Sequence, residues 1–286
     1  MTGFAARLRS ALDRHGPLCV GIDPHPHLLE QWGLAVSADG VREFALRTVE
    51  AAAGRVGVVK PQVAFFERFG SEGYAALEAT LAAARDAGLL TISDAKRGDI
   101  GSTMAAYAAA WLEPGSPLES DALTVSPYLG ADSLRETLTL AVRHGKGVFV
   151  LAATSNPEAA ALQSAHPIDV ASTEGQTVAQ RVARDVSWVN GSAAFDGGLG
   201  PVGLVVGATV DRAEFGLTDE VLRATPLLAP GFGAQGAEPH ELHSLFGALA
   251  GNVVASESRS ILSAGPTALA ARIDERAALY REHHDG

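Results

Sequence analysis

Four charged side chains follow a single apolar run of this sequence within six positions. The run at 89–93 has the composition of a buried strand, and Asp94, Lys96, Arg97 and Asp99 come directly after it. Residues two apart on a strand project to the same side, so Asp94 and Lys96 should point together, with Asp99 returning from the loop that follows. Moving one ion into a dry interior costs on the order of 20 kcal/mol by the Born estimate. The charges therefore predict either a paired network that only stabilises the fold or a wet catalytic cleft.

Two other segments have the composition of phosphate sites. The segment Pro230–Gly236 (PGFGAQG) carries glycines that let backbone N–H groups approach a ligand. The segment 257–259 (ESR) offers the guanidinium fork of Arg259, which suits phosphate oxygens. A glycine-rich loop alone is equally typical of an ordinary turn. Whether both segments can act on one ligand depends on the elements that carry them.

Short apolar runs alternate along the chain with stretches rich in Ala, Leu, Glu and Arg. Eight runs have the composition of strands: Leu18–Asp23, Val56–Lys60, Leu89–Asp94, Ala122–Ser126, Val148–Ala152, Val202–Val206, Pro226–Ala229 and Asn252–Ala255. Helical patterns between them include Asp39–Ala53, Ser71–Ala87, Asp132–His144 and Asp219–Arg223. Eight alternations favour an α/β fold, a parallel (β/α)8 TIM barrel that spans 1–286 as a single domain. A doubly wound open sheet is the alternative, but it would leave two strands to place and lacks a G-x-G-x-x-G after its first strand.

Two segments should lie outside the regular alternation. Phe4, Leu8 and Leu12 fall on one helical face, which predicts an N-terminal helix that covers the barrel; an organelle transit peptide is the lesser alternative. The unit between the fifth and sixth strands is long, so an extra helix or a lid is expected within 156–200. Its part Gly191–Gly200 should form a loop that enters the sixth strand.

In a parallel barrel the carboxyl ends of the strands form one face, where active sites lie. The residues expected at this face are Asp23, Lys60, Asp94, Lys96, Ser126, Thr154, Ser155, the segment Gly231–Gln235 and Arg259. Phosphate is commonly bound in such barrels after strands seven and eight. The barrel therefore favours catalysis for the charged cluster and predicts a phosphorylated substrate.

Composition excludes several classes of partner. A formal net charge of −11 argues against nucleic acid and against an anionic membrane surface, and no apolar run approaches the roughly 18 residues of a membrane helix. The single Cys19 lies in an apolar run and should be a buried small hydrophobe, which fits a reducing, cytoplasmic setting. The pairs His25/His27 and His283/His284 lack a partner cluster, so they predict loop or surface histidines and no metal.

Several longer motifs occur in order over most of the expected barrel. They are GIDP from Gly21, VVKPQVAFFERFG from Val58 to Gly70, SDAKRGDIGST, TVSPYLGADS, ATSNP, LAPGFGAQG, and SRSI ending at Ile261. With these motifs the chain resembles the orotidine 5'-phosphate decarboxylase family, in particular the longer (type 2) subgroup found in many bacteria. D-x-K-x-x-D alone would indicate only the wider group of phosphosugar-processing barrels. One departure is Gly101, which follows Asp99-Ile100 where many relatives have a proline.

The resemblance implies an enzyme without a cofactor that converts orotidine 5'-phosphate to uridine 5'-phosphate and CO2 in pyrimidine biosynthesis. Lys96, kept protonated by the carboxylates that flank it, would attract the developing carbanion and then protonate it. Asp94 would lie against the substrate carboxylate and hold Lys96, while Lys60 and Asp23 would bind ribose hydroxyls and complete the charge network.

The resemblance also implies a homodimer with shared sites, because Asp99 and Thr103 would reach into the neighbouring subunit's site. Ser155 would bond the pyrimidine edge, and Gln235 would bridge base and phosphate. Arg259 would hold the phosphate beside Pro230 and Gly231, and the segment 126–128 (SPY) fits a turn as well as a substrate contact.

Two other functions are weighed against this one. A sister barrel enzyme would act on a keto-sugar phosphate through a metal-stabilised enediolate, and chelation would abolish its activity. A catalytically silent barrel would bind a nucleotide as a sensor and would lack Lys96 or Asp94, both of which are present.

Overall fold

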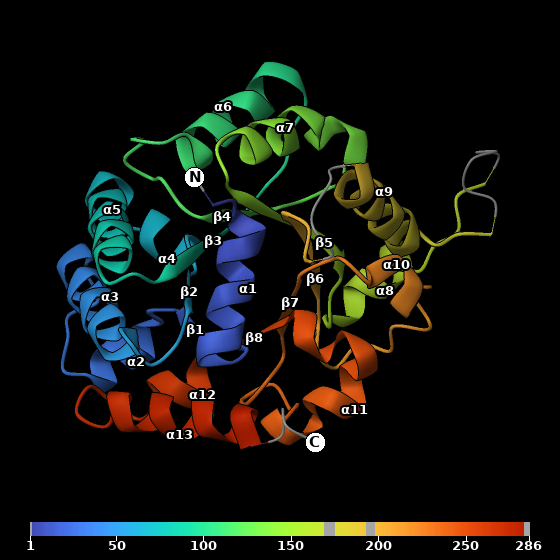
Figure 1. Ribbon diagram of the computed structural model, residues 1–286. Coiled ribbons are helices and arrows are strands. Elements are labelled where there is room, and N and C mark those ends of the chain that lie inside the picture. The colour runs from blue at the N-terminus through green and yellow to red at the C-terminus, as the bar shows by residue number, and fades with distance from the viewer. Residues whose placement is uncertain (1, 169–174, 193–197, 283–286) are drawn as a thin grey trace.

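Eight parallel strands close into a barrel in the order of the sequence (Figure 1). The structure is a computed structural model that describes residues 2–168, 175–192 and 198–282. The strands are β1 (Leu18–Ile22), β2 (Val58–Pro61), β3 (Leu90–Arg97), β4 (Ala122–Val125), β5 (Gly147–Ala153), β6 (Val202–Val206), β7 (Leu227–Pro230) and β8 (Val253–Glu257). All eight predicted strands are confirmed, and β8 pairs with β1 to close the sheet.

Helices surround the barrel, and one of them lies across its end (Figure 1). They are α1 (Phe4–His15), α2 (Pro26–Gln31), α3 (Ala38–Ala52), α4 (Ala64–Glu67), α5 (Gly70–Asp86), α6 (Gly101–Leu112), α7 (Arg135–Arg143), α8 (Ala160–Gln163), α9 (Val178–Ser192), α10 (Asp219–Leu222), α11 (Leu242–Phe246), α12 (Arg259–Leu262) and α13 (Leu269–Glu282). Short 3-10 turns are η1 (Ala131–Leu134), η2 (Pro157–Ala159), η4 (Pro239–Glu241) and η5 (Gly247–Asn252). The predicted helical patterns are confirmed to within a few residues, with η1 supplying the first turn expected at Asp132.

The core has two layers because each strand is buried on both faces. The larger layer lies between the strands and the helices and includes Val20, Val59 and Leu204 of the strands and helix residues such as Phe44. The smaller layer fills the barrel interior and includes Cys19, so the expectation of a buried cysteine is confirmed. The barrel interior is therefore a packed core rather than a channel, so a functional site is expected only at an end of the barrel.

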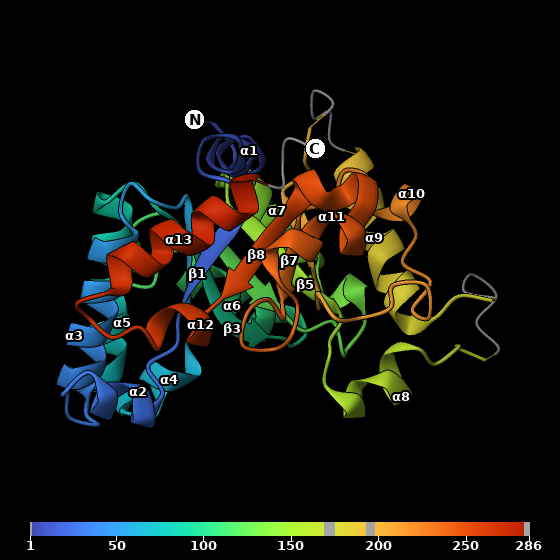
Figure 2. The ribbon, with the colours of Figure 1, turned by 90° about the horizontal axis from the view of Figure 1, so that it is seen from below.

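Helix α1 lies across the amino-terminal end of the barrel, as predicted (Figures 1 and 2). Its buried side chains include Phe4, Leu8 and Leu12, the face that the sequence pattern indicated. Phe4 meets the ring of Phe149 edge-on at 6.1 Å between centroids. A Cβ on Gly147 would lie 2.3 Å from the Phe4 ring, so this glycine makes room for the helix.

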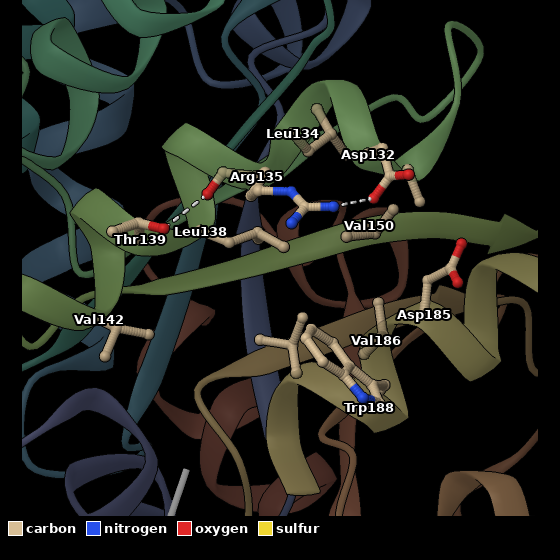
Figure 3. Close-up of a pocket in the computed structure, with 12 residues that line it drawn as sticks. Asp132, Leu134, Arg135, Leu138, Thr139, Val142, Val150, Asp185, Val186 and Trp188 are labelled. Carbon is tan, nitrogen blue, oxygen red and sulfur yellow. Dashed lines mark hydrogen bonds and ion pairs between the residues drawn. The ribbon is translucent and has the colours of Figure 1, made fainter. Parts of the chain in front are cut away.

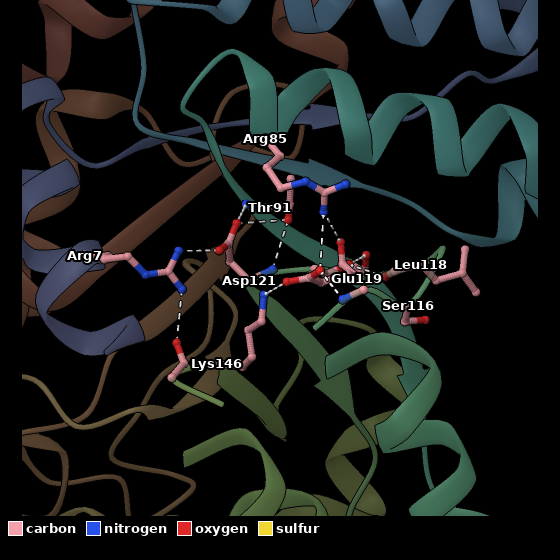
Figure 4. Close-up of polar contacts among 12 residues, drawn as sticks. Arg7, Arg85, Thr91, Ser116, Leu118, Glu119, Asp121 and Lys146 are labelled. Carbon is pink, nitrogen blue, oxygen red and sulfur yellow. Dashed lines mark hydrogen bonds and ion pairs between the residues drawn. The ribbon is translucent and has the colours of Figure 1, made fainter. Parts of the chain in front are cut away.

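Ion pairs hold the same end of the barrel together (Figure 4). Asp121 pairs with Arg7 of α1 and accepts hydrogen bonds from the backbone N–H and hydroxyl of Thr91. Lys146 donates to Glu119 at 2.6 Å. Partial burial opposes ionisation of Glu119, but its bonds to Lys146 and to a backbone N–H lower its pKa. These contacts join α1, β3, β4 and β5 at the amino-terminal end of the barrel and serve stability.

The long unit between β5 and β6 contains the extra helix that the sequence predicted. The 3-10 turn η2 and α8 follow β5, and α9 returns to β6. Of the expected loop 191–200, residues 191 and 192 belong to α9, and 193–197 lie outside the described residues. No helix in the described parts of the chain is long and apolar enough to cross a membrane.

Candidate active site

A cavity of about 550 Å³ opens at the carboxyl ends of the strands. This end lies opposite α1, on the side of α2, α4 and α8 (Figure 2). The predicted site residues that line the cavity are Asp23, Lys60, Asp94, Lys96, Ser155, Pro230, Gly231, Gln235 and Arg259. The fold therefore brings together residues from β2, β3 and β7 and from the segments that follow β1, β5, β7 and β8.

Asp94 is the centre of the polar network in this cavity. Its Oδ2 accepts from Lys60 Nζ at 3.1 Å and from Gln62 Nε2 at 3.0 Å. Its Oδ1 accepts from Lys96 Nζ at 2.5 Å and from the hydroxyl of Thr124 at 2.9 Å. Both oxygens are thus held, and the carboxylate lies between two ammonium groups.

Burial and charge oppose each other at this cluster. Burial favours a neutral Asp94, but Lys60 and Lys96 hold its pKa well below the usual range. Burial likewise opposes the charge of Lys60, and Asp94 and Asp23 nevertheless raise the pKa of its ammonium group. Asp94 and Lys60 are therefore both charged at neutral pH.

The backbone at Lys96 is strained. Its φ of 48° is the only positive value at a non-glycine residue among the described residues. Residues forced into this region cost about 1–3 kcal/mol and are common at active sites. The backbone N–H of Lys96 donates to Thr124 Oγ1 at 2.9 Å, and the pairing of β3 with β4 shifts register just there. With this irregularity β3 extends to Arg97, whereas the sequence pattern predicted that the strand ends at Asp94.

Asp23 has an unused acceptor. Its Oδ1 is buried and has no hydrogen-bond partner in the described part of the chain. Leaving such a group unpaired costs about 1–3 kcal/mol. Because Asp23 lines the cavity, a hydroxyl of a bound ligand could supply the missing donor.

The opposite end of the cavity has the features of an anion site. Gly231 has a φ of 121°, which favours glycine, and the loop from Gly231 to Gly236 lines the cavity with Gly231, Phe232, Ala234 and Gln235. Arg259 is exposed and forms no ion pair with the carboxylates of the described residues. A guanidinium without a carboxylate partner beside backbone N–H groups suits a phosphate.

Asp99 and Thr103 do not line the cavity. Asp99 Oδ1 accepts from the backbone N–H of Ile100 at 2.8 Å, and Thr103 is exposed on the first turn of α6. Within this chain the cavity therefore forms without these two residues, and Ser126, expected at the same face, does not line it either.

Comparison with known proteins gives the family of this barrel. The profile of the orotidine 5'-phosphate decarboxylase / HUMPS family matches residues 16–273. The chain belongs to this family.

Two relatives within the family are identical to this chain at about half of the aligned positions. The orotidine 5'-phosphate decarboxylase of Salinispora tropica is 53% identical over 274 residues, which cover 95% of this chain and 94% of the relative. The enzyme of the same name from Corynebacterium glutamicum is 49% identical over 263 residues, or 92% of this chain and 91% of the relative. The similarity therefore extends through the whole barrel rather than one motif.

Solved structures of the family have the same fold. A crystal structure of a Streptomyces avermitilis protein superimposes with a TM-score of 0.92 at 49% identity and covers 100% of this chain and 97% of that one. The Leishmania donovani OMP decarboxylase superimposes with a TM-score of 0.71 at 31% identity, covering 98% and 99%.

Two residues near the site of this family member were not singled out from the sequence, and the position of a third at the cavity was not predicted. Gln62 lies two positions after Lys60, and the same-face rule that paired Asp94 with Lys96 could have found it. Thr124 lies within an apolar strand, where a threonine is typical of β structure and gives no functional signal. His25 was predicted as a loop residue; it does lie in a loop, but it also lines the cavity with its ring 4.2 Å from that of Phe65.

The other candidate sites are less suited to chemistry. His283 and His284 lie outside the described residues, and the described residues contain no cluster of three or more metal-binding side chains. A second hollow of about 310 Å³ lies on the outside of the barrel between α7 and α9, lined by apolar side chains such as Leu138 and the exposed Trp188 (Figure 3). None of the predicted site residues lies there.

Proposed function

We propose that this chain decarboxylates orotidine 5'-phosphate to uridine 5'-phosphate and CO2, a step of pyrimidine biosynthesis. The observation that carries the proposal is the Asp94 carboxylate held between Lys60 and Lys96, in one cavity with the Gly231 loop and Arg259. The relatives at 49–53% identity carry the same activity in their names. The keto-sugar phosphate enzyme remains the rival within the wider group of barrels.

The cavity suggests how the substrate is oriented. Arg259 and the N–H groups near Gly231 would bind the phosphate, with Gln235 between phosphate and base. Ser155 would bond the pyrimidine edge from the end of β5. Asp23, with its unpaired buried oxygen, would accept from a ribose hydroxyl. This orientation directs carbon 6 of the pyrimidine toward Asp94 and Lys96.

The chemistry requires a localised carbanion to be stabilised. When the bond from carbon 6 to the carboxylate breaks, CO2 leaves and the electron pair remains on carbon 6. The Lys96 ammonium attracts this charge, and one of its protons then moves to carbon 6 to give uridine 5'-phosphate. Lys60 holds the Asp94 charge in place throughout, because it pairs with the second carboxylate oxygen.

Asp94 contributes by repulsion as well as by holding Lys96. It is ionised and lies where the substrate carboxylate must bind, so two like charges face each other before reaction. The repulsion ends when neutral CO2 departs. Binding of the remote phosphate supplies the free energy that brings the two carboxylates together.

We further propose a homodimer with shared sites. Asp99 and Thr103 lie outside the cavity of their own subunit, and the neighbouring Ile100 side chain is 62% exposed. A second opening of about 460 Å³ shares Asp23 and Lys96 with the active-site cavity, so a segment from another subunit could enter there. In this arrangement the partner's Asp99 would join Lys96 and Asp94.

Cys19 supports a cytoplasmic location for this activity, which we propose as well. Its buried position raises the pKa of the thiol to about 12, so it stays protonated and unreactive. It is the only cysteine of the chain. Fractionation of cells into cytoplasm and membrane, with decarboxylase activity measured in each, tests this location.

The first test follows the absorbance of orotidine 5'-phosphate after addition of the purified protein and EDTA. Turnover that persists in EDTA supports a decarboxylase that needs no metal, and its loss in Lys96→Ala assigns the reaction to this site. A folded wild type without turnover would contradict the proposal. Activity on a keto-sugar phosphate that requires magnesium would then favour the rival.

A further inference from the structure

A buried carboxylate lies directly behind the proposed phosphate end of the cavity. Glu257, the last residue of β8, is completely buried, and a single residue separates it from Arg259. Its Oε2 accepts from Ser260 Oγ at 2.6 Å, and its Oε1 accepts from Tyr280 Oη at 2.8 Å. The cavity described above is lined by Ser258 and Arg259 but not by Glu257.

Arg276 of α13 neutralises this carboxylate. Its Nε donates to Glu257 Oε2 at 2.9 Å and its Nη2 donates to Oε1 at 2.9 Å, a two-pronged contact. The same Nη2 lies 3.2 Å from Oε2 of Glu238, which follows the glycine-rich loop. One guanidinium therefore connects the end of β8 with the far side of the loop after β7.

The loop also rests on this cluster. A Cβ added to Gly233 would lie 2.5 Å from Ser260 Oγ and 2.8 Å from Glu257 Oε2, so the backbone packs directly against both. The Phe232 ring meets Tyr280 edge-on at 5.7 Å between centroids. The loop is thus supported from behind by residues that do not reach the cavity.

We propose that Glu257 and Arg276 are positioning residues, which fix the Gly231–Gly236 loop and Arg259 in the relative geometry that binds the substrate phosphate. The inference rests on the proposed function, because it assumes that the substrate phosphate binds at this end of the cavity. Arg276 and Tyr280 lie beyond residue 273, where the match to the family profile ends. They act through the loop and Arg259 rather than on the substrate.

Charge explains why the arrangement needs an arginine. Without Arg276, the Glu257 carboxylate would lie buried and without its guanidinium partner beside the proposed phosphate site, where it would compete with the phosphate for Arg259. Arg276 bonds both oxygens of Glu257, so Arg259 is left for the ligand.

The test uses two variants of the cluster and one matched control. Ser260→Ala removes a single hydroxyl between Glu257 and the Arg259 segment, and Arg276→Lys keeps the charge but loses the two-pronged geometry. The control is Asp274→Asn, which breaks an exposed ion pair of the same helix with Arg55. The measurements are KM and kcat for orotidine 5'-phosphate and the inhibition constant of inorganic phosphate.

We expect both cluster variants to raise KM and the phosphate inhibition constant about tenfold, with kcat within about threefold of wild type. Asp274→Asn should change none of the three. A lower melting temperature with KM and the phosphate constant unchanged would assign the cluster a merely structural role and overturn the inference. If Arg276→Lys does not fold, KM and the phosphate inhibition constant of Ser260→Ala alone test the inference.

The two proposals fail in different ways. A wild type that does not decarboxylate orotidine 5'-phosphate contradicts the proposed function. Phosphate binding, measured directly by calorimetry, would still weaken in the two variants if the cluster positions the loop. Normal decarboxylation by all variants with unchanged constants would overturn the positioning role alone.

Discussion

At the scale of single residues, the site depends on one carboxylate with four hydrogen-bond donors. Asp94 receives two ammonium groups, one amide and one hydroxyl, and the strained backbone of Lys96 directs its side chain onto the same carboxylate. Neither ion pair alone would compensate for burial of this charge. Each donor can therefore be tested separately for its share in catalysis and in stability.

Lys96→Ala should abolish catalysis while the fold persists. The Lys96 side chain is 45% exposed, so its loss leaves no buried cavity. The variant lacks both the cation that stabilises the carbanion and the proton donor, and we expect kcat to fall by about 10⁴-fold or more. Single-turnover kinetics and circular dichroism check this. A fall of less than tenfold would exclude Lys96 as the acid.

Thr124→Val should affect both stability and rate. It removes a buried hydroxyl that donates to Asp94 and accepts from the Lys96 backbone, so about 1–3 kcal/mol of unfolding free energy should be lost. We expect kcat to fall about tenfold as the Asp94–Lys96 pair loosens. Urea unfolding and steady-state kinetics measure the two effects.

Thr137→Val is the matched control, because the hydroxyl of Thr137 is buried and has no hydrogen-bond partner among the described residues. It should be neutral or stabilising and leave kcat unchanged. Equal losses in both variants would contradict the role assigned to Thr124.

The stability of the protein should depend on acid through Asp94. Its pKa in the folded chain lies below the ordinary 3.8, because the two lysines outweigh the effect of burial. Such a group stabilises the fold above its unfolded pKa, and this contribution is lost as the pH falls toward the folded pKa. Between about pH 5 and about pH 2 the wild type should lose more unfolding free energy than Asp94→Asn. Equal losses in urea titrations would exclude this linkage.

At the scale of elements, the strands could be predicted because each is an apolar run between turn residues. All strands of a parallel barrel run in the same direction, so their carboxyl ends must lie at one end of the barrel. This placed Lys60, Asp94 and Arg259 at the same end. Two features could not be predicted from these patterns. The contact of Thr124 with Asp94 depends on the register of β3 on β4, and Arg276 reaches Glu257 across 19 positions of sequence.

The packing of α1 on the barrel gives a prediction at this scale. Gly147→Ala would place a Cβ 2.3 Å from the Phe4 ring, so α1 must shift, and about 1–3 kcal/mol of stability should be lost. KM and kcat should be unchanged because the contact lies at the end opposite the active site. Gly251→Ala, whose Cβ would meet only an arginine tip at 4.0 Å, is the control for thermal denaturation. A loss of activity in Gly147→Ala without a change in melting temperature would contradict this separation.

At the scale of the whole molecule, one chain brings together the predicted site residues except Asp99, Thr103 and the open candidate Ser126. Three exposed apolar side chains lie at or near the carboxyl-end face, on the segments after β3 and β4: Ile100, Tyr128 and Leu129. A homodimer would cover such side chains and supply the missing carboxylate to each site. Twofold symmetry would then give two equivalent sites, each built from both chains.

Mixed dimers test this arrangement directly. Lys96→Ala and Asp99→Ala should each be inactive alone, because each homodimer has the same defect in both sites. When equal amounts of the two variants are combined and their chains exchange freely, half of the dimers contain one chain of each variant. In such a mixed dimer one site has both Lys96 and Asp99, and the other site lacks both. Activity should therefore recover to about a quarter of wild type. Lys96→Ala mixed with Asp94→Ala should recover nothing, since both residues act in the cavity of their own chain. If affinity capture through a tag on one variant detects mixed dimers and the first pair also stays inactive, Asp99 does not complete the partner's site.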